Sequence, residues 1–139
     1  MKERTFVMVK PDGVKRQLVG EIIRRLEQRG FILLDIRMFV PTESLARQHY
    51  RVHCEKHFFP NLIRFITSGP VVAMAWEGSE IVAAVRRMLG PTNPVEAPPG
   101  TLRGDFATHM DHNIAHASDS VGTAQEELAL WFSCSSPSG

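Results

Sequence analysis

The order in which two apolar patterns alternate along this chain restricts its fold more than any other feature. Three short runs rich in β-branched and aromatic residues predict strands over residues 5–9, 31–40 and 71–77, and residues 113–118 can form a last short strand. Elsewhere, apolar residues recur every three or four positions, which is the spacing of an amphipathic helix. The clearest example is residues 19–29, where Val19, Ile22, Ile23 and Leu26 fall at i, i+3, i+4 and i+7.

Further helices are predicted over residues 42–50, 60–67 and 80–89, and after Ser120, which can cap a last helix. The resulting outline is βαββαβ, which predicts an α+β, ferredoxin-like fold with a four-stranded, mainly antiparallel sheet and helices on one face. At 139 residues the chain is long enough for one ordinary core, so we expect a single domain over residues 1–139. The polar residues 133–139 are expected to form a flexible tail.

Two segments lack a periodic apolar pattern. Residues 10–13 (KPDG) have the composition of a turn, which places Lys10 at the exit of the first strand. Residues 90–105 contain four prolines and three glycines and are predicted to form a long loop. Loops of that length inside a compact domain tend to be functional when they are ordered.

Composition excludes several classes of protein. No apolar run approaches the length of a membrane span, and the first residues do not resemble a signal peptide. Cys54 and Cys134 form neither a CxxC pair nor a zinc-binding pattern. We therefore expect a cytoplasmic protein. A net charge of +1 argues against an overall electrostatic grip on nucleic acid, so an anion site must come from a local cluster of basic groups.

The chain contains no GxxxxGK[ST] phosphate loop and no GxGxxG fingerprint, so a nucleotide would have to be held by side chains. The candidates for phosphate contacts are Lys10, Arg86, Thr92 and Arg103. Arginine can bind two phosphate oxygens at once, and lysine supplies a mobile charge. Taken singly, each basic residue is more simply explained as a surface residue, because exposed Lys and Arg are the norm.

His116 lies among small residues and hydroxyls in the segment NIAHASDS. A lone histidine there is most simply a packed residue near the core, since most histidines do no chemistry. The following helix carries Thr123, Glu127 and Trp131 on one stripe, which can bring a carboxylate towards the strand of His116. Glu127 could then fix the imidazole tautomer and raise its nucleophilicity, or it could simply face solvent.

Three other side chains also leave two interpretations open. Phe58 could stack on a base or fill the core. Asn113 could bond a ribose or turn the chain. Tyr50 could donate its hydroxyl to a phosphate or to the backbone.

Five sequence blocks occur in a specific order: ERTFVMVKPDGVKR, SGPVVAMAWEG, MLGPTNP, PGTLRGDF and NIAHASDS. Together they closely resemble the nucleoside diphosphate kinases, from about residue 3 to residue 132. The resemblance implies an enzyme that moves the terminal phosphate of a nucleoside triphosphate to a nucleoside diphosphate in a ping-pong cycle. It also implies Mg²⁺ carried by the nucleotide phosphates, with no protein ligand for the metal. The histidine that takes the phosphate in this family matches His116.

The same resemblance implies roles for the other candidates. The positions that match the family's phosphate ligands are Lys10, Tyr50, Arg86, Thr92 and Arg103. Asn113 matches the ribose ligand, Phe58 the aromatic that stacks on the base, and Met110 a contact on the base's other side. Glu127 matches the carboxylate near the histidine, with Ser118 supporting it. Weak base selectivity would follow, because every base offers a π-face for stacking.

The resemblance further implies a homo-oligomer, for which we favour a hexamer over a tetramer because the Pro-rich loop supports hexameric contacts in the family. Ala117 stands where the family usually has glycine after the histidine, and we expect a backbone conformation that alanine can adopt. Two other functions compete with the enzyme. One is a regulatory module that binds a small effector without catalysis, and the other, secondary because of the near-neutral charge, is a binder of single-stranded nucleic acid.

Overall fold

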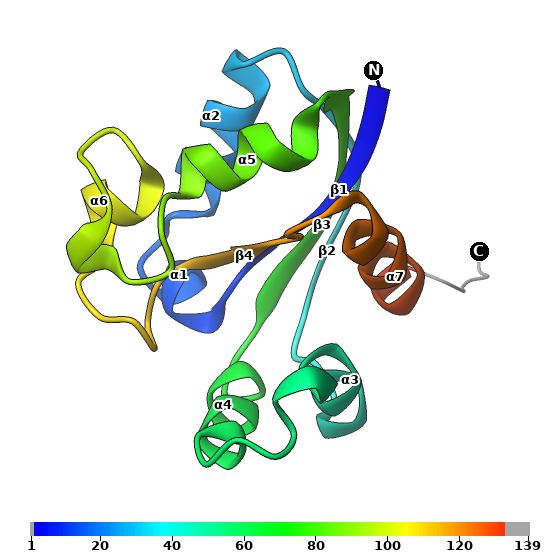
Figure 1. Cartoon of the computed structure of the whole chain (residues 1–139), viewed down its shortest axis with the longest axis vertical. Helices are drawn as coiled ribbons and strands as arrows, with labels where there is room; N and C mark the ends of the chain where they lie inside the picture. The colour runs from blue at the N-terminus through cyan, green and yellow to red at the C-terminus, as the bar shows by residue number, and fades with distance from the viewer. Residues whose placement is uncertain (1, 133–139) are drawn as a thin grey trace.

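A four-stranded antiparallel sheet organises the computed structural model, which describes residues 2–132 (Figure 1). Its strand order is β2-β3-β1-β4. The strands are β1 (Lys2–Val9), β2 (Ile32–Phe39), β3 (Val71–Ser79) and β4 (Ala115–Ala117). Every neighbouring pair is antiparallel, which confirms the predicted ferredoxin-like α+β sheet. The predicted tail, residues 133–139, lies outside the described residues.

Helices connect the strands close to the positions that periodicity predicts. The longer ones are α2 (Val19–Gln28), α3 (Glu43–His49), α4 (Phe59–Ile66), α5 (Ile81–Leu89) and α7 (Val121–Phe132). The hydroxyl of Ser120 accepts a hydrogen bond from the Thr123 amide at 3.1 Å, so the predicted cap of the last helix is present. Within residues 2–132, no helix has the length and apolar character needed to cross a membrane.

The prediction of helices on one face only is wrong, because helices cover both faces of the sheet. Successive side chains of a strand point to opposite faces. On one face, Val7 and Val9 of β1 join a core with α2 and α5. On the other, Phe6 and Met8 join a second core with α3, α4 and α7. Figure 1 shows these two groups of helices on either side of the strands. The βαββαβ outline accounts for α2 and α5, whereas the helices of the second face are additions to it.

The predicted turn at residues 10–13 is also incorrect, since a short helix, α1 (Pro11–Lys15), follows Lys10 directly. Proline suits the first helical position because its fixed φ fits the helix and its missing N–H would be unpaired there anyway. A Cβ on Gly13 would lie 2.8 Å from the carbonyl oxygen of Ile114. The glycine therefore lets α1 approach the segment that leads into β4.

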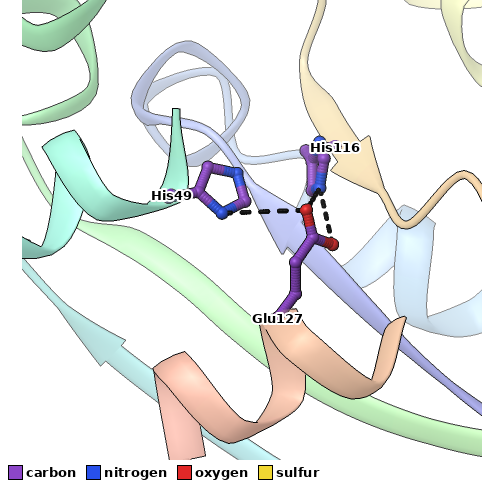
Figure 2. A group of neighbouring side chains, drawn as sticks. All are labelled: His49, His116 and Glu127. Carbon is purple, nitrogen blue, oxygen red and sulfur yellow. Dashed lines mark hydrogen bonds and ion pairs between the residues drawn. The ribbon is translucent and has the colours of Figure 1, made fainter. Parts of the chain in front are cut away.

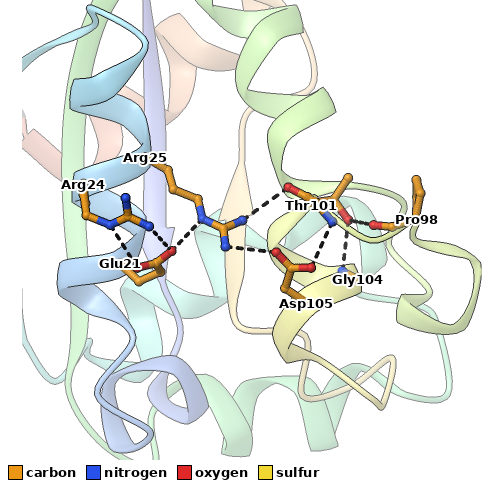
Figure 3. A network of polar contacts seen from close by, with 8 residues as sticks. Glu21, Arg24, Arg25, Pro98, Thr101, Gly104 and Asp105 are labelled. Carbon is orange, nitrogen blue, oxygen red and sulfur yellow. Dashed lines mark hydrogen bonds and ion pairs between the residues drawn. The ribbon is translucent and has the colours of Figure 1, made fainter.

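The predicted long loop of residues 90–105 is instead ordered by η2 (Pro94–Glu96) and α6 (Leu102–Phe106). Arg25 of α2 contacts both α6 and the segment before it, as Figure 3 shows. Its guanidinium donates to a carboxylate oxygen of Asp105 at 2.9 Å and to the carbonyl of Gly100 at 3.3 Å. Its Nε also bonds Glu21 at 2.7 Å. The loop is thus attached to α2 by charged hydrogen bonds.

Candidate functional site

His116 is the middle residue of β4, the three-residue edge strand of the sheet. It lies opposite Met8 of β1 in the strand register. Its side chain is 22% exposed and borders a cavity of about 550 Å³, which Tyr50 and His53 also line. Cavities of this size accommodate small-molecule ligands. The imidazole is therefore held on rigid backbone and remains accessible from a pocket.

A carboxylate holds one ring nitrogen of His116. Nε2 lies 3.0 Å from both carboxylate oxygens of Glu127 (Figure 2). The hydroxyl of Ser118 donates to one of these oxygens at 2.6 Å. Burial would raise the pKa of Glu127, but the hydrogen bonds and charge around it, above all those of His116, lower the pKa below its ordinary value. An ionised carboxylate only accepts hydrogen bonds, so Nε2 carries the proton. Nδ1 is then the ring nitrogen with the free lone pair.

Lys10 and Asn113 form a second part of the site. The ammonium of Lys10 donates to the side-chain oxygen of Asn113 at 2.9 Å, and the Asn113 amide donates to the carbonyl of Thr92 at 3.0 Å. Burial, followed by the charge of Arg103, lowers the pKa of Lys10 to about 8, and Asp12 opposes this change. Residues about a hundred positions apart in the sequence thus meet beside β4.

Two arginines hold the backbone on either side of His116. Arg103 donates to the carbonyls of Ala115 at 2.7 Å and Gly90 at 2.8 Å, and Arg86 donates to the carbonyl of Ala117 at 3.1 Å. Arg103 is only 4% exposed, and burial together with the charge of Arg86 lowers its pKa to about 10. Because a guanidinium has five N–H donors, each arginine keeps donors for an anion. Arg103 is therefore buried, whereas Arg86 is exposed, as its sequence context suggests, and still reaches the backbone beside His116.

The backbone is strained two residues before the histidine. Ile114 has φ +82°, and the amide of Ala115 bonds the carbonyl of Asn113 at 2.9 Å across it. This i→i+2 arrangement is a γ-turn of the rare, strained kind. The carboxylate of Asp12 stabilises the turn by accepting a hydrogen bond from the Ile114 amide at 2.9 Å. Ala117 is not among the residues with positive φ, so alanine fits at that position, as predicted.

The remaining predicted residues lie around the cavity and at the surface. Tyr50 is buried, and its hydroxyl has no hydrogen-bond partner among residues 2–132. Phe58, 40% exposed, packs against His53 with ring centres 5.6 Å apart. Met110 is 59% exposed on a separate turn.

Sequence reasoning misses one buried residue of the site, His49. Its side chain is 1% exposed, and its Nδ1 lies 3.8 Å from a carboxylate oxygen of Glu127. Within residues 2–132, His49, His116 and Glu127 are the only set of three side chains grouped closely enough to hold a metal ion. Two imidazoles and one carboxylate suit Mg²⁺ poorly, since this ion prefers oxygen ligands. The adjacent Tyr50 is the only sequence signal that could have pointed to His49.

Comparisons with known proteins agree with this geometry. The family model "Nucleoside diphosphate kinase" matches residues 3–136. A nucleoside diphosphate kinase of Cyanothece sp. is 58% identical over 130 residues, which are 94% of this chain and 87% of that protein. Among solved structures, the halophilic nucleoside diphosphate kinase of Halobacterium salinarum in complex with CDP has a TM-score of 0.94 and 46% identity, covering 96% of this chain and 90% of that one. A nucleoside diphosphate kinase family protein from Babesia bovis has a TM-score of 0.92 and 48% identity, covering 94% and 88%.

Proposed function

This chain belongs to the nucleoside diphosphate kinase family, and we propose that His116 is the residue that carries the phosphate between the two nucleotides. Membership makes it an enzyme that transfers the terminal phosphate of a nucleoside triphosphate to a nucleoside diphosphate through a phosphohistidine. This activity excludes the alternative that the chain is a regulatory module that binds an effector without catalysis. The observation that supports His116 is its pairing with Glu127, which leaves Nδ1 unprotonated beside a cavity.

In the first half of the cycle, Nδ1 of His116 attacks the terminal phosphorus of the triphosphate. A P–N bond forms while the bond to the bridging oxygen breaks, and its electron pair leaves on the departing diphosphate. The imidazole gains positive charge, which Glu127 stabilises through the proton on Nε2. The second half reverses these steps with another diphosphate as acceptor. Ser118 supports the carboxylate in both halves by donating to it.

Phosphoryl transfer depends more on alignment and charge compensation than on proton transfer. Lys10, Arg86 and Arg103 supply the positive charge around the phosphates in this proposal. Tyr50 donates its unpaired hydroxyl to a phosphate, and Thr92 contributes a further phosphate contact. Asn113, which already orients the Lys10 ammonium, bonds the ribose. Their convergence on both sides of β4 is the support for these roles.

For the base, we propose stacking on Phe58, with Met110 on the opposite side. Both side chains are apolar and exposed, and neither offers a polar group that would read the base edge. Low base selectivity follows. The Halobacterium salinarum relative is solved with CDP, a pyrimidine nucleotide. We propose that this chain binds nucleoside diphosphates in the same way.

We further propose that Mg²⁺ arrives with the nucleotide and is held by phosphate oxygens and water. The ion would neutralise phosphate charge while the protein contributes Lys10 and the two arginines. A cytoplasmic location is proposed because nucleoside triphosphates are intracellular metabolites.

A homo-oligomer is proposed from the surface of β2, and a hexamer is favoured over a tetramer because of the family's Pro-rich loop. This edge strand and the residue after it expose five large apolar side chains, namely Ile32, Leu34, Ile36, Met38 and Val40. Exposed apolar edge strands favour association with another chain, because they present both unpaired backbone groups and hydrophobic surface. A second copy of the chain would cover both. Nucleic acid remains a secondary partner at most.

Incubation with γ-labelled ATP tests the assignment of His116. We expect the wild-type protein to acquire one phosphate that is stable in base and labile in acid. His116→Ala should remove the label and the exchange of phosphate between nucleotides, while the melting temperature changes little because the side chain is partly exposed. Full labelling of the His116→Ala variant would refute the assignment.

A further inference from the structure

His49 is a buried imidazole beside the catalytic pair that the steps above do not use. It lies at the end of α3, and its ring meets the ring of His116 edge-on, with centres 4.7 Å apart. The indole nitrogen of Trp131 donates to its Nδ1 at 3.1 Å. Trp131 is itself 4% exposed and stacks on Phe6. Two buried rings from α3 and α7 are therefore joined by a hydrogen bond next to Glu127.

The Trp131 contact determines the tautomer of His49. An indole N–H can only donate, so Nδ1 of His49 must present its lone pair to it. The proton of the neutral ring then resides on Nε2. Burial, followed by the charge of His116, lowers the pKa of His49 to about 3, so the second proton is absent near neutral pH.

Glu127 therefore lies between two imidazoles but bonds only one. His116 Nε2 is 3.0 Å from its oxygens, whereas His49 Nδ1 is 3.8 Å from the nearer one (Figure 2). A proton on His49 Nδ1 would attract the carboxylate oxygen, and an approach of a few tenths of an ångström would make this contact a second N–H···O bond. The carboxylate would then share its negative charge with His49 and stabilise a cationic His116 less well.

We propose that the Trp131–His49 hydrogen bond leaves the Glu127 carboxylate to His116 alone. His49 acts as a positioning residue, and the Trp131 N–H prevents its Nδ1 from donating to Glu127. The inference rests on the proposed role of His116 as the phosphate carrier. It extends that role by explaining why a second imidazole can lie against the same carboxylate without competing for it. The Trp131 N–H is what prevents the competition.

The charged surroundings of His49 keep it in this state. Glu127 on α7 favours a positive charge on the ring, whereas His116 on β4, Lys10 after β1 and His53 in η1 (Arg51–His53) oppose it. Burial acts in the same direction as these three and is the largest influence. Because the balance favours the neutral ring, His49 does not compete for Glu127 over the pH range in which the enzyme would act.

Long-range ¹H–¹⁵N NMR of the unliganded wild-type protein tests the tautomer directly. We expect His49 to show an unprotonated Nδ1 and a protonated Nε2 at neutral pH. A proton on Nδ1 of His49, or a cationic ring, would overturn the proposal. This measurement requires neither a variant nor catalysis.

Single-turnover phosphorylation of Trp131→Phe tests the consequence. This substitution keeps an aromatic ring but removes the N–H, so His49 becomes free to donate to Glu127. We expect phosphorylation to slow by about tenfold, which is the effect of one competing hydrogen bond on the barrier, with KM for the nucleotide little changed. Adding His49→Leu to Trp131→Phe removes the competing donor and should recover most of the rate.

Packing alone predicts a different pattern. A second core substitution would then add to the damage, so a double variant as slow as Trp131→Phe, or slower, would refute the proposal, as would a Trp131→Phe variant of normal rate. Phe39→Leu is the matched control, since the centres of the Phe39 and Trp131 rings lie 5.8 Å apart while the Trp131 N–H donates to His49. It should lower the melting temperature and leave the rate unchanged. Labelling at a residue other than 116 would instead refute the role of His116.

Discussion

The ammonium of Lys10 lies where burial and Arg103 favour its neutral form. Its pKa falls from the ordinary value of 10.5 to about 8. The folded protein therefore binds fewer protons at Lys10 than the unfolded chain between these values, and stability rises with pH across that window. Below about pH 8 Lys10 stays charged, and the burial of that charge lowers the stability of the folded protein. The site keeps a cation ready for phosphate at the expense of some stability.

This placement predicts how catalysis depends on pH. For the free enzyme, kcat/KM should fall as the pH rises above about 8, approaching tenfold per pH unit, because the proposed phosphate-binding charge is lost. Lys10→Arg keeps a charge at all accessible pH values and should abolish this decline, even if its rate is lower throughout. Because the nucleotide ionises in the same way in both assays, the ratio of wild-type to Lys10→Arg values removes its contribution. A wild-type kcat/KM that stays level to about pH 10 would contradict the role of Lys10.

Among the elements, α6 is the one whose position depends most clearly on a remote side chain. It carries Arg103, and Arg25 attaches it to α2 through Asp105 and Gly100 (Figure 3). The Arg25 guanidinium also lies over the ring of Phe106, 5.3 Å from its centre. Loss of these contacts would free the helix that supplies one of the two arginines beside His116.

Arg25→Ala should therefore affect both stability and nucleotide binding. We expect a loss of about 1–2 kcal/mol from the charged hydrogen bonds, a melting temperature lower by roughly 4 °C, and a KM for the nucleotide raised several-fold with a smaller change in kcat. Arg24→Ala is the control, because Arg24 shares Glu21 with Arg25 but reaches no residue of α6. Thermal melting and steady-state kinetics provide the comparison. Equal effects of the two substitutions would show that α6 does not depend on Arg25.

Sequence periodicity locates the long elements well and the short ones poorly. The predicted helix of residues 19–29 differs from α2 by one residue, because its apolar spacing directly reflects the face it buries. α1 and α6 each have five residues, too few to show a period, and are held by distant partners such as Ile114 and Arg25. Such partners become visible only in three dimensions.

The same reasoning separates the two histidines of the site. Small neighbours and a carboxylate on the next helix make His116 a candidate, and the resemblance of its segment to the nucleoside diphosphate kinases is what assigns it a role from the sequence. His49 depends on Trp131, which is 82 positions away, so no local pattern indicates its function. The helices of the second layer are predicted as helices, but the face that they cover is not, because the βαββαβ outline says nothing about where helices added between its elements pack.

At the scale of the whole molecule, the apolar edge of β2 predicts self-association. Charged side chains on an edge strand discourage pairing with another chain. Ile36→Lys combined with Met38→Lys should therefore reduce the mass measured by light scattering towards that of one chain, with circular dichroism unchanged. Val121→Lys alters an exposed apolar residue away from β2 and should leave the mass as it was. A double variant of unaltered mass would place the contact elsewhere.

The strand order has a consequence for how such an assembly would operate. β2 and β4 are the two outer strands, with β3 and β1 between them, a separation of about 14 Å at the usual spacing between strands. Neighbouring copies could join along one border of the sheet while the opposite border remained open to incoming nucleotide. Each copy would then turn over independently, and the velocity would follow substrate concentration as a simple hyperbola with no sigmoidal phase.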